Sequence, residues 1–135
     1  MPNCICKSGK SYKNCCEPFH KGEKKPKTAL ELMRSRYSAY ANSLADYIIE
    51  TTSEDNPTYM PDKEHWKTDI LDFCQKTTFI DLQIISAKEE NKTAEVTFQA
   101  FLSQGGKDFS FVEKSLFEKV DGKWLYKSGE ILNQS

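Results

Sequence analysis

The spacing of apolar residues changes near residue 78, and this change separates two kinds of secondary structure. Before it, apolar side chains return at steps of three and four, as on one face of an α-helix. After it, they return at every second position, as on one face of a β-strand. Helices first and strands afterwards predict a segregated α+β domain, with a curved sheet packed on helices.

Three helices are expected in the first part of the chain. Thr28 and Glu31 have the spacing of a capping box, which predicts a helix start at this point. Ser43 is expected to cap a second, shorter helix. On the third helix, Cys74 belongs to the apolar stripe and is expected to be a small buried hydrophobe. The first expected helix begins at Thr28 and breaks at Asn42-Ser43, the second is residues 44–52, and the third follows Pro61-Asp62 and runs to about Lys76.

Four strands are expected in the second part. Gly105-Gly106 and Asp121-Gly122 are hairpin signals that separate segments of alternating polarity. The short connections favour a four-stranded antiparallel meander that curls over the helices. The expected strands are residues 79–88, 93–103, 108–120 and 123–132.

Four of the five cysteines lie within the first 16 residues, at Cys4, Cys6, Cys15 and Cys16. Structural zinc takes four ligands, and thiolate is among its preferred donors. A head of about 20 residues has almost no core and needs a metal to fold, so one structural Zn²⁺ is predicted. Using two adjacent cysteines requires an irregular backbone, and His20 is the alternative to one of them. The competing interpretation is a tail of free or disulfide-forming thiols.

The stretch CICKSGKSYKNCC resembles the SEC-C motif, a zinc-binding tail of the secretion ATPase of the bacterial preprotein translocase. Together with EPFHKG and LMRSRYSAY, it makes the chain similar to the YchJ-like family. The resemblance implies a nuclear transport factor 2-like domain, a cone of helices and curved sheet, behind the motif. It also implies zinc on the four clustered cysteines. The corresponding units are the motif at 1–20, a linker at 21–27 and the cone domain at 28–135.

Docking is the function that the resemblance implies, because the similar motif of the translocase ATPase docks a chaperone and the ribosome. The sequence therefore favours a non-enzymatic zinc-binding adaptor whose head docks to a protein partner related to secretion, chaperones or the ribosome.

Charge is unevenly distributed, although the whole chain carries only −1. Residues 1–36 contain nine basic and three acidic side chains, a balance of +6, and the rest of the chain carries −7. Four thiolates with one Zn²⁺ would lower the first value to about +4. A basic head of this kind suits acidic protein surfaces or phosphates. Lys7, Lys10 and Lys13 beside Tyr12 make an RNA- or ribosome-associated protein the alternative.

A pocket inside the cone domain is the second alternative, with Arg36, Tyr40 and Glu113 as its nearest residues. Glu113 shares one strand face with aromatic neighbours, which suits either an ion pair or a pocket carboxyl group. A small-molecule-binding or enzymatic function would use this interior. Glu113 is the only, weak, catalytic candidate, and no Ser-His-Asp or Cys-His arrangement can be recognised. Catalysis is therefore the less favoured hypothesis.

The cellular setting follows from what the sequence lacks. No apolar run approaches the roughly 20 residues of a membrane helix, and no apolar segment follows the N-terminus as in a secretory signal. A cytoplasmic protein without membrane insertion is expected. Related folds pair through the outer face of the sheet, which makes a homodimer an open alternative.

Overall fold

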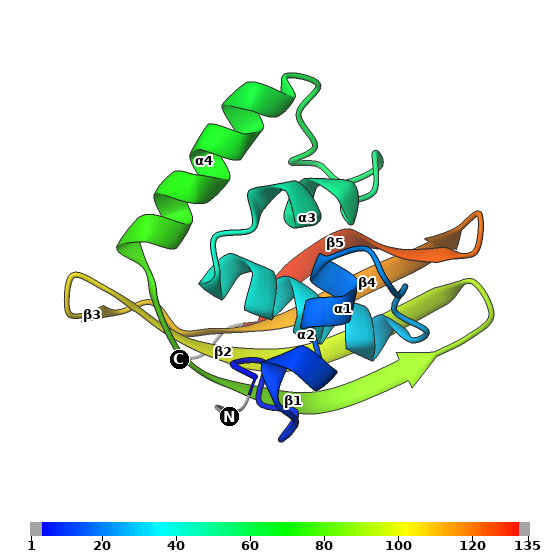
Figure 1. Cartoon of the computed structure of the whole chain (residues 1–135), viewed down its shortest axis with the longest axis horizontal. Helices are drawn as coiled ribbons and strands as arrows, with labels where there is room; N and C mark the ends of the chain where they lie inside the picture. The colour runs from blue at the N-terminus through cyan, green and yellow to red at the C-terminus, as the bar shows by residue number, and fades with distance from the viewer. Residues whose placement is uncertain (1–3, 133–135) are drawn as a thin grey trace.

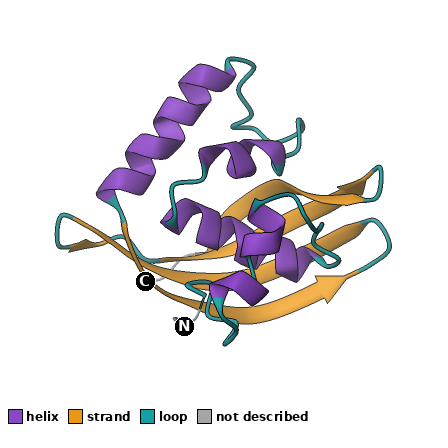
Figure 2. Cartoon of the chain, in the orientation of Figure 1, coloured by secondary structure: helices purple, strands orange, loops and turns teal. Residues whose placement is uncertain are grey.

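The computed structural model describes residues 4–132, in which a layer of helices lies on one face of an antiparallel sheet (Figures 1 and 2). The predicted α+β order is confirmed. The helical elements are η1 (Tyr12–Asn14), α1 (Glu17–His20), α2 (Ala29–Ala41), α3 (Ala45–Glu50) and α4 (Lys63–Lys76). The strands are β1 (Thr78–Glu89), β2 (Thr93–Gln104), β3 (Lys107–Asp108), β4 (Phe111–Val120) and β5 (Lys123–Leu132).

The sheet has the order β1-β2-β4-β5, and every pairing within it is antiparallel. The third expected strand is divided, since the short β3 pairs with the end of β2 before β4 begins. Its interruption has a local cause at Ser110. The Ser110 amide donates to the Asp108 carboxylate at 2.9 Å, while the Ser110 hydroxyl accepts from the Leu102 amide at 3.1 Å. Side chains thus replace the backbone ladder at this point.

Two of the three predicted helix starts are confirmed, and both carry a side-chain cap. Thr28 Oγ1 accepts from the Glu31 amide, and the Asp62 carboxylate accepts from the His65 amide, both at 3.1 Å. The prediction that Ser43 caps α3 is wrong, because the N-cap is Leu44 and carries no side-chain cap. Ser43 instead adopts φ 59°, a left-handed turn that ends α2 and redirects the chain.

The main core of the cone domain lies between α2 and the concave face of the sheet. Large buried side chains of β2, β4 and β5 pack against α2 there, and each contributes about 1.5–3 kcal/mol of burial free energy. A second cluster joins α3 to α4 around Trp66, Ile70 and the buried Cys74. The principal core residues are Leu32, Met33, Tyr37, Val96, Phe98, Leu102, Phe117 and Trp124.

The cysteine head (residues 1–20, described from Cys4) packs against α2. Arg34 of α2 donates from Nη1 to the Cys6 carbonyl at 2.6 Å. His20 of α1 donates from Nε2 to the Ser35 carbonyl at 2.8 Å, because a carbonyl oxygen can only accept. Helix α2 therefore carries the head on one side and the main core on the other. Among the described residues, no helix has the length and hydropathy to cross a membrane.

Candidate metal centre and candidate binding cavity

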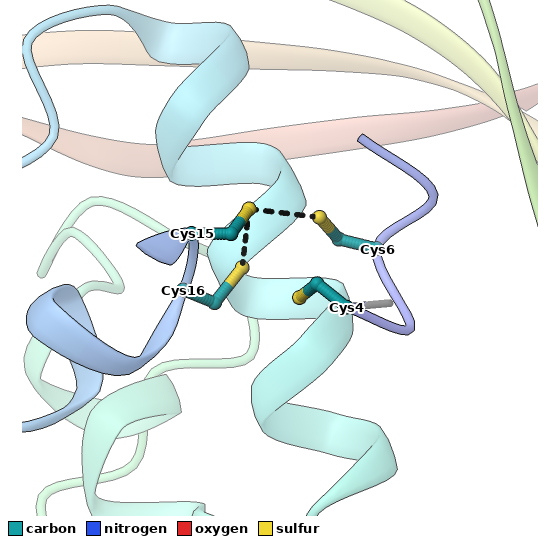
Figure 3. A group of neighbouring side chains, drawn as sticks. All are labelled: Cys4, Cys6, Cys15 and Cys16. Atoms are coloured by element: carbon teal, nitrogen blue, oxygen red, sulfur yellow. Dashed lines mark hydrogen bonds between the residues drawn. The ribbon is translucent and has the colours of Figure 1, made fainter. Parts of the chain in front are cut away.

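The structure brings the four clustered cysteines together, with all their Sγ atoms within 4.8 Å of one another (Figure 3). The Cys6 and Cys15 sulfurs are 3.5 Å apart, and those of Cys15 and Cys16 are 3.8 Å apart. Four thiolates around Zn²⁺ at about 2.3 Å require sulfur–sulfur edges of about 3.8 Å. The donor set and its spacing therefore fit a tetrahedral metal site.

Local backbone geometry makes this convergence possible. Lys7 and Gly9 have positive φ values of 66° and 90°, which turn the chain tightly after Cys6. The Cys4 amide then donates to the Lys10 carbonyl at 2.7 Å and closes the loop. Cys15 has the irregular angles φ −124° and ψ −93°, so that its side chain and the next one converge.

The thiols influence one another strongly. Hydrogen bonds from Cys16 and Cys4 lower the pKa of Cys6 far below its ordinary value. Hydrogen bonding to Cys4 and Cys6, together with burial, raises the pKa of Cys16. Burial raises the pKa of Cys15 to about 11. Without a cation, Cys6 is thus the thiol that most readily loses its proton, and a divalent cation would favour deprotonation of all four sulfur ligands.

His20 lies beside the cysteine cluster but not within it. Its Nε2 donates to Ser35, and its Nδ1 accepts from the Tyr12 hydroxyl at 2.7 Å. Burial lowers the pKa of His20, which favours this neutral form. Nε2 thereby holds the head to α2 and Nδ1 binds within the head, so neither ring nitrogen is free to ligate a metal.

A cavity of about 450 Å³ occupies the interior of the cone domain, and Arg36, Tyr40 and Glu113 all line it. Most of its wall is aromatic or aliphatic and comes from α2, α4 and the concave face of the sheet. The exposed Thr58 and Asp69 mark the side where it meets solvent. Its aromatic wall includes Tyr37, Trp66, Phe73, Phe79, Phe98 and Phe111.

Glu113 is held in this wall by two hydroxyl groups. Its Oε2 accepts from Tyr126 at 2.9 Å and from Ser115 at 2.5 Å. Burial first, and then the neighbouring carboxylate, raise the pKa of Tyr126 well above its ordinary range. The Tyr126 hydroxyl therefore remains a donor at neutral pH and fixes the position of Glu113.

Arg36 approaches the same wall from α2 and is only 8% exposed. Its Cζ lies 4.6 Å from the centroid of the Tyr126 ring, a cation–π contact. Its Nη1 donates to the Ile48 carbonyl at 3.1 Å and to the hydroxyls of Thr51 and Thr52 at 2.8 and 3.0 Å. The end of α3 thus orients the guanidinium.

Sequence reasoning did not predict that Tyr126 and Ser115 bind Glu113, and it assigned no role to Gly129. Alternation on β4 and β5 places the first two on the concave face, but their bonds to Glu113 follow from strand pairing. A Cβ at Gly129 would overlap the Tyr126 hydroxyl and the Glu113 carboxylate. The available signal was a glycine inside a strand, which marks a close approach.

The fold and the cluster together define a nuclear transport factor 2-like domain preceded by a four-cysteine head. A sequence profile for the YchJ middle NTF2-like domain matches residues 28–129. A UPF0225 protein of Actinobacillus succinogenes is 37% identical over 125 residues, covering 91% of this chain and 78% of the relative. The UPF0225 protein SCO1677 of Streptomyces coelicolor is 35% identical over 98% of both chains. The chain belongs to the YchJ-like family of UPF0225 proteins, which confirms the resemblance.

Solved structures agree with this assignment. The chain is similar to RPA3114, a SEC-C motif containing protein from Rhodopseudomonas palustris, with a TM-score of 0.84 and 31% identity over 98% of this chain and 100% of that one. A SEC-C motif containing protein from Psychrobacter arcticus, at 22% identity over 98% of this chain and 84% of that one, has a TM-score of 0.76 and supports the fold alone. The predicted fold class is confirmed.

Proposed function

We propose that this chain is a cytoplasmic zinc-binding adaptor whose metal fixes a basic head for docking to a protein partner. The main observation that supports this proposal is the convergence of four Sγ atoms within 4.8 Å of one another in the head that packs on α2. Four thiolates around one Zn²⁺ fill a tetrahedral site and leave no position for a reactive water, so the metal is structural.

The head depends on the metal because it contains little else to stabilise it. Its buried cluster consists of Cys4, Cys6 and Cys16, with Tyr12 and Cys15 packed against them. Even with Ile5 and Phe19 half-buried against the cone domain, these few side chains bury too little apolar area to offset the conformational entropy of ordering about 20 residues. Metal binding supplies the missing free energy, as in other small zinc modules.

The docking surface is the lysine-rich outer side of the head. Lys7, Lys10 and Lys13 are all exposed, and the metal holds the loop that carries them. A fixed cluster of positive charges favours an acidic partner by attracting it over about a Debye length, 8 Å at physiological salt.

Metal analysis of purified, untagged, reduced protein tests the zinc site. We expect about one zinc per chain in the wild type and in Cys74→Ser, which changes a thiol outside the cluster. Cys15→Ser should lose the metal together with the order of residues 4–20 in the ¹H–¹⁵N NMR spectrum. A zinc-free wild type under reducing, metal-replete conditions would contradict the proposal.

Site-specific cross-linking tests the docking role. A photoreactive amino acid at Lys10 should cross-link one acidic protein in cells, and a Lys7→Glu/Lys13→Glu background should abolish the product. The same amino acid at the exposed Lys88, on strand β1 outside the head, is the control. A product removed by nuclease and strongly weakened by salt would support the RNA-associated alternative instead. Equal labelling from both positions would refute head-specific docking.

Small-molecule binding is a second candidate function, favoured by the 450 Å³ cavity, which lies within the size range of ligand pockets. A buried arginine and a hydrogen-bonded carboxylate are uncommon in an otherwise apolar interior, since burying charge costs free energy. Titration of the full chain with small aromatic probes tests this function independently of the metal.

A further inference from the structure

Two opposite charges face the cavity without pairing with each other. In the described part of the chain, neither Arg36 nor Glu113 takes part in an ion pair. The Tyr126 side chain links them, with its ring under the guanidinium and its hydroxyl bonded to the carboxylate. This ring keeps the charges apart, and both still line the cavity.

Both groups keep unused hydrogen-bonding capacity. All three hydrogen bonds of Arg36 to the end of α3 come from Nη1. Its Nε and Nη2 atoms have no acceptor among residues 4–132. Oε2 of Glu113 accepts both of its bonds, so Oε1 has no donor within the same residues. Donors are therefore available over the Tyr126 ring and an acceptor beside the Tyr126 hydroxyl.

Tyr40 adds a third unused polar group. Its hydroxyl has no hydrogen-bond partner in the described structure, although the side chain lines the cavity. Burial raises the pKa of Tyr40, while the positive charge of Arg36 opposes this shift and the negative charge of Glu113 adds to it. The hydroxyl thus lies within the fields of both charges and remains protonated.

The arrangement is held rigidly by the segment that follows α3. The Tyr126 amide donates to the Thr51 carbonyl, and the Ser53 amide donates to the Tyr126 carbonyl, both at 2.8 Å. Thr51 also binds Arg36, so one segment positions both side chains. Gly129 leaves the space that Tyr126 and Glu113 occupy. A preorganised site of this kind loses little conformational entropy when a ligand binds.

We propose that the cavity binds an uncharged, flat aromatic molecule that carries a polar group of the primary-carboxamide type. The carbonyl of this carboxamide would accept from Arg36 and Tyr40, and its N–H would donate to Glu113 Oε1. Aromatic side chains around the cavity suit a flat ring by edge and face contacts. An anionic group on the ligand would match Arg36 but be repelled by Glu113, and a cationic group the reverse, whereas a neutral group with both a donor and an acceptor satisfies both side chains at once.

The inference rests on the second candidate function, and three probes with one ring system test it on the full chain. They are 2-naphthamide, 2-naphthoate and naphthalene, measured by titration calorimetry and ¹H–¹⁵N NMR. We expect 2-naphthamide to bind about tenfold or more tighter than the other two, with shifts at residues of the cavity wall. Naphthoate binding best, or naphthalene binding equally well, would overturn the ligand class while small-molecule binding stands. No binding of any probe would overturn both.

Substitutions identify the groups responsible. Glu113→Gln should weaken 2-naphthamide about tenfold and strengthen 2-naphthoate, because the repelling charge is removed. Tyr40→Phe should weaken the amide about threefold to tenfold and leave naphthalene unchanged. Since the Tyr40 hydroxyl has no protein partner among the described residues, this variant should fold normally. Glu130→Gln, an exposed carboxylate on β5, is the matched control and should change nothing. Unchanged probe preference in both Glu113→Gln and Tyr40→Phe would refute the assigned head-group contacts.

Discussion

The cysteine head and the cone domain are stabilised in different ways, although they meet on one helix. The head buries three cysteines, with Ile5 and Phe19 half-buried against the cone domain, while the cone domain buries large side chains from α2 and from the strands of its sheet. Metal ligation stabilises the first, and apolar burial stabilises the second. The head therefore depends on metal supply and thiol chemistry, whereas the cone domain depends on packing.

This contrast predicts that the two parts respond to different perturbations. A chelator should disorder the head and leave the cone domain folded. A core substitution should lower the stability of the cone domain without removing a metal ligand. The contacts of α2 with the head are the place where the two responses can become coupled.

The largest effect is expected from Phe117→Ala in the main core. Phe117 is 2% exposed, so its truncation should lower the free energy of unfolding by about 3–5 kcal/mol. Urea denaturation followed by tryptophan fluorescence measures this loss. Leu116→Ala on the opposite face of β4 is the control and should cost less than about 1 kcal/mol. Equal losses in the two variants would contradict the location of the core.

Arg34→Ala should separate the head from α2. Its charged hydrogen bond to the Cys6 carbonyl is of a kind that contributes about 1.5–3 kcal/mol. We expect zinc to transfer to a chelator about tenfold faster or more, while the urea midpoint of the cone domain changes little. Lys13→Ala, an exposed head residue, is the control. Unchanged zinc transfer would show that this hydrogen bond does not hold the head.

Gly129→Ala should disturb the cavity wall. The added Cβ overlaps Glu113 and Tyr126, and overpacking of this kind costs about 1–3 kcal/mol. Thermal unfolding should register the loss, and the zinc content should stay at the wild-type level. Gly122→Ala tests a glycine of positive φ with open space around its Cβ, so it separates backbone strain from crowding. A stable Gly129→Ala variant would contradict the close approach of these side chains.

Thr28→Ala should have the smallest effect of the four. It removes the hydroxyl that accepts from the Glu31 amide and should lower the free energy of unfolding by about 1 kcal/mol. Thr28→Ser retains the oxygen and should restore most of the loss in urea denaturation. A loss that Ser does not restore would assign the effect to packing of the methyl group.

Much of the fold was predictable because its determinants are local. Alternation and the hairpin glycines determined the strands, and Thr28 and Asp62 determined two helix starts. The break in the third strand was not predictable from periodicity, since it depends on Asp108 and Ser110 bonding across a turn. Ser43 had the composition of a cap but adopts a left-handed conformation, because the chain must turn between α2 and α3.

The two candidate sites also differ in how far the local sequence determines them. Sequence spacing identified Cys4, Cys6, Cys15 and Cys16 as one group, because four thiols within 16 residues are typical of a metal site. The cavity wall joins α2, α4 and the concave face of the sheet, and its polar contacts depend on long-range pairing. Alternation indicated that Glu113 faces the aromatic side of its strand. It gave no indication that Tyr126 links Glu113 to Arg36, nor that Gly129 must be small.

Zinc K-edge X-ray absorption on the intact protein tests the central claim most directly, because it counts the ligands of the metal that the head is proposed to need. We expect four sulfur neighbours at about 2.3 Å and no light-atom ligand. A spectrum that requires a nitrogen at about 2.0 Å would mean that His20 replaces a cysteine, against the two hydrogen bonds that engage its ring. Such a spectrum, or a protein that retains no zinc, would contradict the four-cysteine site.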